Sequence, residues 1–506
     1  MINDQSLNGY PCHFLSSSHR LQATTIYFTG TMKLKQIGYT LLTITTVFAS
    51  ATPAKAANFT TVASGLNNPS GITFGPDGSL YVGETGTGGD GNCQPSPSAA
   101  FANICAGQTG SLTKVDLISG TQTRVIDNFD SLALQPTLEQ GAGPQEIAFD
   151  FLGNAYLVSG YAGYPGNRDI GLFELSQDAE LPPEQDFIAP PTEDPDELLN
   201  VSNLGKLFKV DLATQEFTEL FDFAQYEQLN NLDGGDYISN PFAIAIQEDS
   251  AFVVDAGANV IYNIGLADGE LRNAFAAPTQ LVDNVEFPPA SPFEPPQNSG
   301  EDTPVMGGDP SQLPPEGEEP EMPSFEVPEG PLDLQSVPTG ITIGPDGAAY
   351  YAELTGYPYP EGEARVLRIN EAGVPEVFAE GFTQITDLTF DADGNLLVLQ
   401  FADEAQWKNS VEGSLKNLPG SVVKVTPDGK RTTIAQEGIF SATGIQVGPD
   451  GGIYVANNGI GTNGSVIRFD DVESVPEPGT ILGLLFFGGA SIFGLKGKRD
   501  GLKKAD

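Results

Sequence analysis

One phrase returns six times in this chain and limits the folds that the chain can adopt. Residues 69–84 read PSGITFGPDGSLYVGE, residues 338–353 read PTGITIGPDGAAYYAE, and a third clear copy covers residues 443–457. Weaker copies cover residues 144–159, 241–255 and 386–400. Each copy places two short apolar runs on either side of a turn, and Asp-Gly in that turn favours positive φ. Repeated copies of one supersecondary unit indicate a repeat architecture.

Further apolar runs follow each copy, for example at residues 112–116, 207–211, 366–370 and 422–426, so each repeat predicts a second hairpin. Four strands per repeat make one blade of a β-propeller. We therefore expect an all-β fold, a six-bladed β-propeller of four-stranded blades. An open solenoid of stacked hairpins is the alternative.

The last repeat supplies a third strand at residues 466–469, but no fourth strand follows it. The phrase FTTVASGL at residues 59–66 resembles the fourth-strand phrases at residues 377–382 and 432–438. We expect this N-terminal strand to close the last blade, because ring closure removes unpaired strand edges. The propeller would then span residues 57–472 as one domain.

Charge and histidine content exclude several functions. The chain holds 23 Lys and Arg against 67 Asp and Glu, a net charge of −44, which repels phosphate backbones and anionic lipids. Nucleic acid is therefore not expected as a partner. Both histidines, His13 and His19, lie in residues 1–31, which we interpret as a non-native upstream extension. A mature chain without histidine excludes Ser-His-Asp and Cys-His catalysis and His-ligated metals.

Residues 32–56 have the pattern of a signal peptide for export. A basic start at Met32 is followed by an apolar core at residues 37–48, and Ala54-Lys-Ala56 fits a signal-peptidase site. In an exported chain we expect Cys93 and Cys105 to pair as a loop staple. A redox-active pair is the alternative.

Unequal spacing between the repeats indicates insertions. The anchors of the first strands are 75, 97, 97, 47 and 57 residues apart: Ile72, Ile147, Ile244, Ile341, Leu388 and Ile445. Acidic, proline-rich insertions lie near residues 161–203 and 276–336, and this composition opposes packing. We expect mobile, extended surface loops, with a lid or a cation-attracting fringe as the alternative.

The C-terminal residues 473–499 join Pro476-Glu477-Pro478 to an apolar run and a basic cluster at residues 496–499, followed by a tail at 500–506. The apolar run is short for a hydrocarbon core of about 30 Å. The segment resembles the PEP-CTERM sorting signal of bacteria that make exopolysaccharide. That resemblance implies a transient inner-membrane tether, cleavage by an exosortase, and release to the periplasm, cell surface or extracellular matrix. A permanent single-span anchor is the alternative.

Two carboxylates are placed to face each other across the channel. Just before the apolar anchor the six blades carry Gly71, Glu146, Ala243, Gly340, Asp387 and Gly444. Glu146 and Asp387 therefore sit on the opposed blades 2 and 5. Because three blades have glycine there, we infer that the fold needs no carboxylate and that these acids are functional. A cation such as Ca²⁺ or Mg²⁺, a water cluster or raised pKa values should accompany them.

A second polar ring lies at the ends of the second strands. Its members are Glu84, Ser159, Asp255, Glu353, Gln400 and Asn457. They are candidates for a ligand site at the channel mouth. The alternative is that they accept backbone N–H groups at the following turn.

Several phrases in order resemble the ScyD/ScyE family of exported propellers, named after the gene cluster for the cyanobacterial sunscreen scytonemin. These phrases are residues 74–78, the Cys93 to Cys105 loop, and residues 167–169, 254–259, 353–358 and 387–391. More distantly the blades look like NHL and gluconolactonase-type propellers, whose channel cation is held by a Glu, two amides and an Asp. This chain lacks the matching pair of channel asparagines. The family is not defined by a reaction, so the resemblance implies none.

We expect an exported binding or assembly factor of the cell envelope or matrix, linked to scytonemin or exopolysaccharide, whose ligand is a small molecule, a polysaccharide or a protein. The alternative is a lactonase-like hydrolase that needs Ca²⁺ or Mg²⁺ and uses Glu146 or Asp387 as general base.

Overall fold

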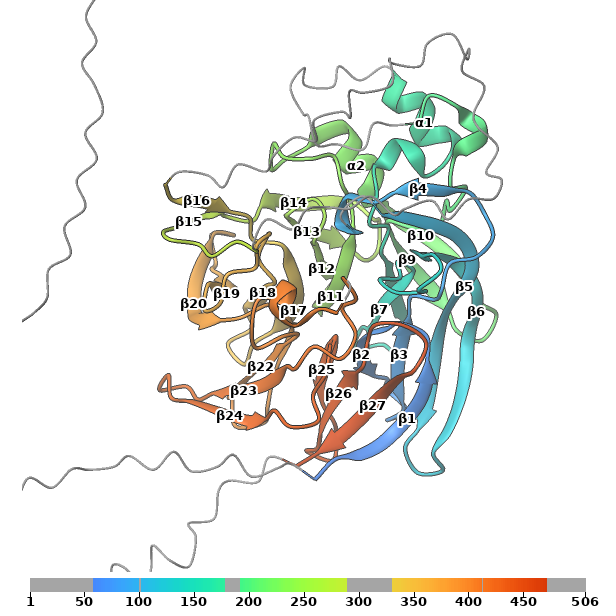
Figure 1. The fold of residues 1–506 in the computed structure, drawn as a ribbon. Coiled ribbons are helices and arrows are strands. Elements are labelled where there is room, and N and C mark those ends of the chain that lie inside the picture. The colour runs from blue at the N-terminus through green and yellow to red at the C-terminus, as the bar shows by residue number, and fades with distance from the viewer. Residues whose placement is uncertain (1–57, 100–101, 178–191, 289–329, 412, 471–506) are drawn as a thin grey trace, which may run out of the picture. The chain divides into compact units, whose positions relative to one another are not determined.

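The computed structural model describes residues 58–99, 102–177, 192–288, 330–411 and 413–470, and these form a six-bladed β-propeller (Figure 1). Each blade contributes one innermost strand: β2 (Pro69–Phe74), β7 (Pro144–Phe149), β11 (Pro241–Gln247), β17 (Pro338–Ile343), β21 (Ile385–Phe390) and β25 (Gly444–Val447). Each innermost strand packs against its two neighbours, and β25 packs against β2, which closes the ring. The predicted fold class is confirmed. Residues 1–31, the signal peptide, the sorting signal and the tail lie outside the described residues.

The remaining strands follow outward within each antiparallel blade. Blades 1 to 3 add β3 (Leu80–Glu84), β5 (Asn103–Asp116) and β6 (Thr121–Leu134); β8 (Ala155–Ser159), β9 (Lys206–Asp211) and β10 (Glu216–Asp222); β12 (Ser250–Asp255), β13 (Val260–Gly265) and β14 (Leu271–Ala276). Blades 4 to 6 add β18 (Ala349–Glu353), β19 (Ala364–Ile369) and β20 (Pro375–Phe382); β22 (Leu396–Gln400), β23 (Ser421–Val425) and β24 (Arg431–Ala435); β26 (Ile453–Asn457), β27 (Gly464–Phe469) and β1 (Thr60–Leu66).

The N-terminal strand closes the last blade, as the sequence predicts. Strand β1 pairs antiparallel with β27, from Thr60 opposite Arg468 to Leu66 opposite Gly464. The ring of Phe59 packs edge-on against Phe469 at 5.4 Å. The first and last blades are therefore joined by strand pairing rather than by loop contacts alone.

The described residues form seven hydrophobic clusters, six of which each lie between two neighbouring blades. Second strands such as β3 and β18 are buried along their whole length, because neighbouring blades cover both faces. Aromatic pairs such as Tyr81–Phe149 and Phe74–Tyr454, with centroids 5.1 and 5.0 Å apart, contact each other across blade boundaries. Each blade is thus stabilised mainly by its neighbours.

The described part of the first insertion is packed, which differs from the mobile loop expected. It contains η2 (Pro165–Asn167), α1 (Ile170–Gln177) and η3 (Pro195–Glu197). Arg168 is 2% exposed, its guanidinium donates two hydrogen bonds of 2.7 Å to Asp222, and it also pairs with Asp169. This buried cation with two carboxylates, together with buried Tyr161 and Tyr164, outweighs the acidic composition.

Other elements lie outside the four-strand pattern of the blades. Strand β15 (Gln280–Val282) pairs with β16 (Leu332–Leu334) at the base of the second insertion, of which residues 289–329 lie outside the described residues. The short β4 (Cys93–Pro95) pairs with β5, and η1 (Pro97–Ala99), α2 (Phe223–Asn230) and α3 (Gln406–Asn409) complete the structure. No helix in the described ranges is long and apolar enough to cross a bilayer.

Candidate functional site: two chambers in the channel

The innermost strands surround two cavities. The upper chamber, of about 520 Å³, is lined by one residue from the start of each blade: Ser70, Gln145, Phe242, Thr339, Thr386 and Thr443. The lower chamber, of about 260 Å³, is lined by residues farther along the same strands, such as Thr73, Ile246 and Thr342. Along their strands, Glu146 and Asp387 directly follow the upper-chamber residues Gln145 and Thr386. They therefore lie at the boundary of the two chambers.

Glu146 and Asp387 both line the lower chamber, so the structure brings the two predicted acids to one cavity. Each is 8% exposed and is bonded to the next blade. Glu146 Oε2 accepts the Ile244 N–H at 3.0 Å, and Asp387 Oδ2 accepts the Ile445 N–H at 2.7 Å. Both acids therefore fasten adjacent blades as well as facing the cavity.

The surroundings of the two acids raise the pKa of each carboxyl. Burial raises the pKa of Glu146, and the nearby charge of Asp387 raises it further. Burial raises the pKa of Asp387 to about 7. No Lys, Arg or His lines the lower chamber to offset these effects. In the described ranges no group of three or more His, Cys, Asp or Glu is placed to hold a metal ion.

Glycine precedes each acid in the ring for a steric reason. A Cβ on Gly71 would lie 2.6 Å from Glu146 Cβ, and a Cβ on Gly340 would lie 2.7 Å from Asp387 Cα. Gly71 therefore makes room for the side chain of Glu146, and Gly340 makes room for the backbone at Asp387. Gly444 likewise makes room for the backbone of blade 1, which carries no acid at this position, so the inference that the fold needs no carboxylate there stays a prediction.

The second polar ring points into the blades rather than into a chamber. Four members accept the N–H of a residue shortly before their own first strand, at 2.6 to 2.9 Å: Glu84 from Asn67, Asp255 from Asn240, Gln400 from Thr383 and Asn457 from Phe440. Glu353 instead accepts two bonds of 2.7 Å from Arg365, and Ser159 accepts the Lys206 N–H at 3.2 Å. None of the six lines either chamber. Their geometry matches the alternative of backbone capping.

The upper chamber combines aromatic rings, amides and hydroxyls, with almost no charge. Its aromatic side chains are Phe242, Tyr357, Tyr359 and Phe401, and its amides include Gln145, Asn240, Asn259, Gln335 and Gln406. Apart from the two tyrosines, Asp236 is the one ionisable residue that lines this chamber. Burial and the charge of Asp233 raise the pKa of Asp236. Sequence reasoning missed this chamber because most of its lining comes from loops and carries no charge motif, and the residue that each blade adds from its repeated phrase is uncharged.

Several residues that line the upper chamber have positive φ, and two of them, Val337 and Thr355, are β-branched. Thr355 has φ +73°, a region that β-branched residues rarely adopt, and its buried hydroxyl has no hydrogen-bond partner among the described residues. The equivalent residue of blade 1 is Gly86, with φ +84°. Strain of this kind costs about 1–3 kcal/mol and is concentrated at functional sites.

We expect Thr355→Gly to raise the free energy of unfolding by about 1 kcal/mol, because glycine relieves the strain at a small entropic cost. Urea unfolding measures the change. The control is Thr85→Gly. Thr85 also lines the upper chamber but does not have positive φ, so glycine relieves no strain there and should destabilise the chain. Loss of stability in Thr355→Gly would contradict the interpretation that Thr355 is strained.

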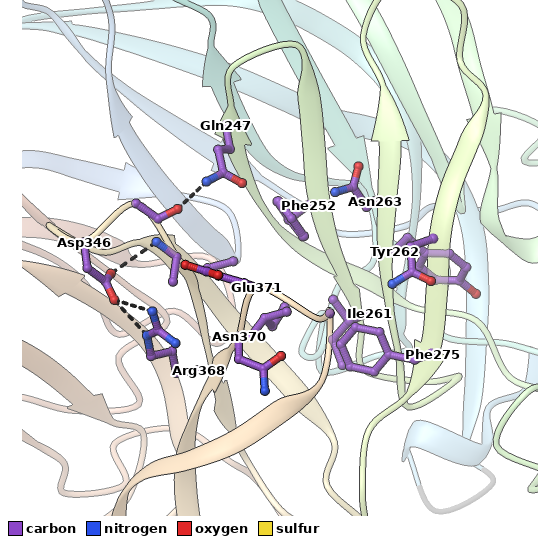
Figure 2. A pocket seen from close by; sticks show the side chains of 16 residues that line it. Gln247, Phe252, Ile261, Tyr262, Asn263, Phe275, Asp346, Arg368, Asn370 and Glu371 are labelled. Carbon is purple, nitrogen blue, oxygen red and sulfur yellow. Dashed lines mark hydrogen bonds and ion pairs between the residues drawn. The ribbon is translucent and has the colours of Figure 1, made fainter.

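A further cavity of about 340 Å³ lies between blades 3 and 4, where the two blades face each other (Figure 2). It shares no lining residue with either chamber.

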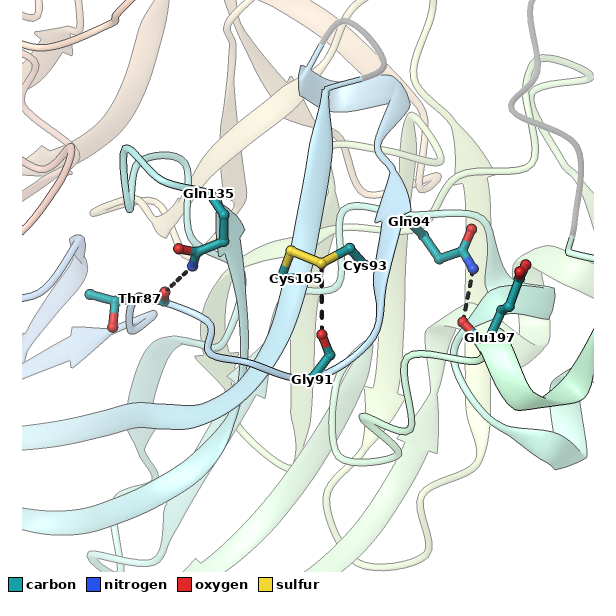
Figure 3. The surroundings of a disulfide bond; sticks show 7 residues. All are labelled: Thr87, Gly91, Cys93, Gln94, Cys105, Gln135 and Glu197. Atoms are coloured by element: carbon teal, nitrogen blue, oxygen red, sulfur yellow. Dashed lines mark hydrogen bonds between the residues drawn. A yellow bond between two sulfur atoms is a disulfide. The ribbon is translucent and has the colours of Figure 1, made fainter. Parts of the chain in front are cut away.

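The predicted disulfide between Cys93 and Cys105 is present and ties β4 to β5 (Figure 3). The disulfide closes an arm that runs from Cys93 to Cys105, and this arm contributes Ser96, Ser98 and Ile104 to the wall of the upper chamber. The same arm is docked on the first insertion, since Gln94 Nε2 donates to the Glu197 carbonyl at 2.8 Å. The disulfide therefore supports one wall of the chamber.

Removal of the disulfide in Cys93→Ser/Cys105→Ser should lower stability by roughly 3 kcal/mol, the loop-entropy value for so short a loop. Thermal melts with and without reductant measure the effect in the wild-type chain, and the double variant should not respond to reductant. An unchanged melting temperature in both comparisons would mean that the arm opens independently of the ring.

No family model matches the chain, and no curated protein matches it. Among solved structures, a protein described as a gluconolactonase is 11% identical, with 82% of this chain and 94% of that chain covered and a TM-score of 0.38. A gluconolactonase from Xanthomonas campestris is 9% identical, with coverages of 82% and 89% and a TM-score of 0.38. A glucose dehydrogenase is 12% identical, with coverages of 82% and 100% and a TM-score of 0.37. Similarity at this level transfers no chemistry.

Proposed function

We propose that this chain is a binding protein that holds an uncharged aromatic ligand in the upper chamber. The observation that carries the proposal is the lining of that chamber: four aromatic side chains with amides and hydroxyls, and Asp236 as its single Asp or Glu, without Lys or Arg. A cavity of about 520 Å³ lies in the usual range for small-molecule sites. Aromatic rings and a few placed polar groups favour a flat ligand with hydroxyl or carbonyl groups.

The resemblance to the ScyD/ScyE family supports a specific ligand class. A sunscreen pigment absorbs light through conjugated rings, so scytonemin and its precursors have the aromatic surface that this chamber favours. The net charge of −44 disfavours anionic ligands. The protein would assist assembly or export of such a pigment in the cell envelope or in the exopolysaccharide layer.

We also propose that the chain is exported through its signal peptide and processed by an exosortase at residues 476–478. The Cys93–Cys105 disulfide supports this proposal, because structural disulfides persist in oxidising compartments. Mass spectrometry of the secreted chain would give its two ends. Termini near residue 57 and residue 477 are expected, and an intact residue 32–56 segment on the secreted chain would contradict export by this route.

The chain contains a single tryptophan, and it is placed to report on the chamber. Trp407 Nε1 donates to the carbonyl of Pro358 at 3.0 Å, and Pro358 lies between the chamber residues Tyr357 and Tyr359. We expect neutral indoles and phenols to shift Trp407 emission in a saturable way. Phe242→Ala should weaken that binding at least about tenfold, whereas Phe252→Ala, outside the chamber, should not. The absence of saturation with every aromatic compound would refute the proposal.

One observation favours a second function. A carboxyl with a pKa of about 7, such as Asp387, is suited to act as a general base at neutral pH. Turnover of glucono-δ-lactone that is lost in Asp387→Asn but kept in Phe242→Ala would support a hydrolase centred on the lower chamber. We expect no such turnover, because both oxygens of Asp387 already accept backbone N–H groups.

A further inference from the structure

Five blades share a pair of residues that blade 3 lacks. On the second and third strands of those blades, a large apolar or aromatic residue lies opposite a Lys or Arg: Tyr81 and Lys114, Tyr156 and Lys209, Tyr350 and Arg368, Leu397 and Lys424, Tyr454 and Arg468. In blade 3 the same register places Phe252 opposite Asn263. The long basic side chain is therefore replaced by a short amide in one blade of six.

The first hairpin of blade 3 differs as well. Its turn is only Glu248-Asp249, shorter than the GPDG-type turns of other blades. Asp249 pairs with Arg272 of β14 at 2.7 Å instead of with a third-strand cation. Asn263 thus occupies the position that a Lys or Arg occupies in the five other blades, and Asn263 carries no charge that needs a partner.

The groove between blades 3 and 4 lies where this basic side chain is missing, and Figure 2 shows its walls. Asn263 and Asn273 are directly opposite each other on β13 and β14, so their amides share one face of blade 3. The buried Oδ1 of Asn263 has no hydrogen-bond donor among the described residues. Gln247 donates to the Gly347 carbonyl across the two blades, which ties the groove together at that point.

The opposite wall offers a paired cation rather than a free one. Arg368 of blade 4 donates to Asp346 at 2.7 Å, and Asn370 and Glu371 lie beside it. Phe252 and Phe275 supply apolar surface between the polar groups. The groove thus offers amide donors and acceptors in adjacent positions, next to aromatic faces, without an unpaired positive charge.

We propose that this groove binds a neutral sugar residue of a glycan. Vicinal hydroxyls donate and accept hydrogen bonds at spacings that paired carboxamides match, and the aliphatic face of a sugar ring packs on aromatic side chains. An anionic ligand is disfavoured by the net charge of −44, and a cationic one would compete with Arg368 for Asp346. The buried acceptor of Asn263 would take a sugar hydroxyl as its donor.

The decisive variant is Asn263→Lys, which restores the residue type used by the five other blades. We expect this variant to fold with an unchanged or higher melting temperature, because it follows the pattern of the repeat, and to fill the groove. Asn273→Ala removes one amide and should weaken binding at least about tenfold. The matched control, Lys209→Asn, changes the equivalent residue of blade 2 and leaves the groove intact.

The probes are short neutral oligosaccharides of glucose, galactose, mannose and xylose, screened by saturation-transfer NMR and titrated calorimetrically. Binding of at least one of them by the wild-type chain and Lys209→Asn, with loss in Asn263→Lys, supports the proposal. Absence of binding by every sugar, equal binding by Asn263→Lys, or preferential binding of tetramethylammonium would overturn it. Because the groove shares no residue with the upper chamber, failure here leaves the Trp407 experiment unaffected.

Discussion

We expect deletion of residues 59–66 to abolish the cooperative unfolding of the ring, although it removes only one strand of the last blade. The deletion leaves β27 unpaired and removes the buried side chains Ala63 and Leu66 from the cluster between blades 6 and 1. Loss of the buried leucine alone costs about 2–5 kcal/mol, and the exposed edge of β27 adds a template for aggregation. We expect a loss larger than any single substitution produces, measured by urea unfolding and by sedimentation.

The matched control is deletion of residues 290–328, a longer segment. The deleted segment lies inside the second insertion, between residues 280–282 and residues 332–334, which pair as β15 and β16. The deletion therefore removes no strand of the ring. We expect little change in melting temperature from this deletion. An unchanged melting temperature after loss of residues 59–66 would show that pairing of β1 with β27 does not hold the ring closed.

Substitution of either channel acid should stabilise the protein at neutral and higher pH. Because burial raises the folded-state pKa of Asp387 to about 7, the folded state binds more protons than the unfolded state between about pH 4 and pH 7. The free energy of unfolding therefore falls as the pH rises through that window, by at most roughly 1.4 kcal/mol per pH unit. Asp387→Asn and Glu146→Gln remove part of this loss. Below about pH 4, where the acids are protonated in both states, neither substitution should stabilise.

Asp346→Asn provides a control of opposite sign. Burial alone would raise the pKa of Asp346, but hydrogen bonds from the Ala348 N–H and Arg368 lower it overall. Its contribution is therefore present at neutral pH and lost as the pH falls, so Asp346→Asn should destabilise near pH 7 and not at low pH. Melting curves of the three variants between pH 3 and pH 9, roughly spanning these pKa values, separate the two behaviours. Stabilisation of the wild-type chain by Ca²⁺ that disappears in Glu146→Gln would instead indicate a shared cation.

The ring and its closure could be predicted because each depends on short sequence patterns that repeat along the chain. Each blade repeats an apolar pair around a turn, and the strand at residues 59–66 matches the missing fourth strand of the last repeat. The convergence of Glu146 and Asp387 on one cavity also followed from equivalent positions in the repeat. Repeat alignment therefore predicted which residues share a layer of the channel.

What repeat alignment could not predict is how neighbouring layers interact. The steric role of Gly71 depends on the side chain of Glu146 in the next blade. The hydrogen bond from the Ile244 N–H to Glu146 likewise joins two different blades. The packing of the first insertion depends on Arg168, whose partner Asp222 is 54 residues away. The upper chamber takes one residue from the start of each repeated phrase, but most of its lining comes from loops outside the phrases, so repeat alignment does not mark it as a site.

A crystal structure of the secreted chain with the tightest aromatic ligand from the Trp407 titrations tests the central claim most directly. We predict ligand density in the upper chamber, against Phe242 and Tyr359 and within hydrogen-bond reach of Gln145 or Thr386. Density in the lower chamber between Glu146 and Asp387, with the upper chamber free of ligand, would contradict the claim and move the functional site to the acids.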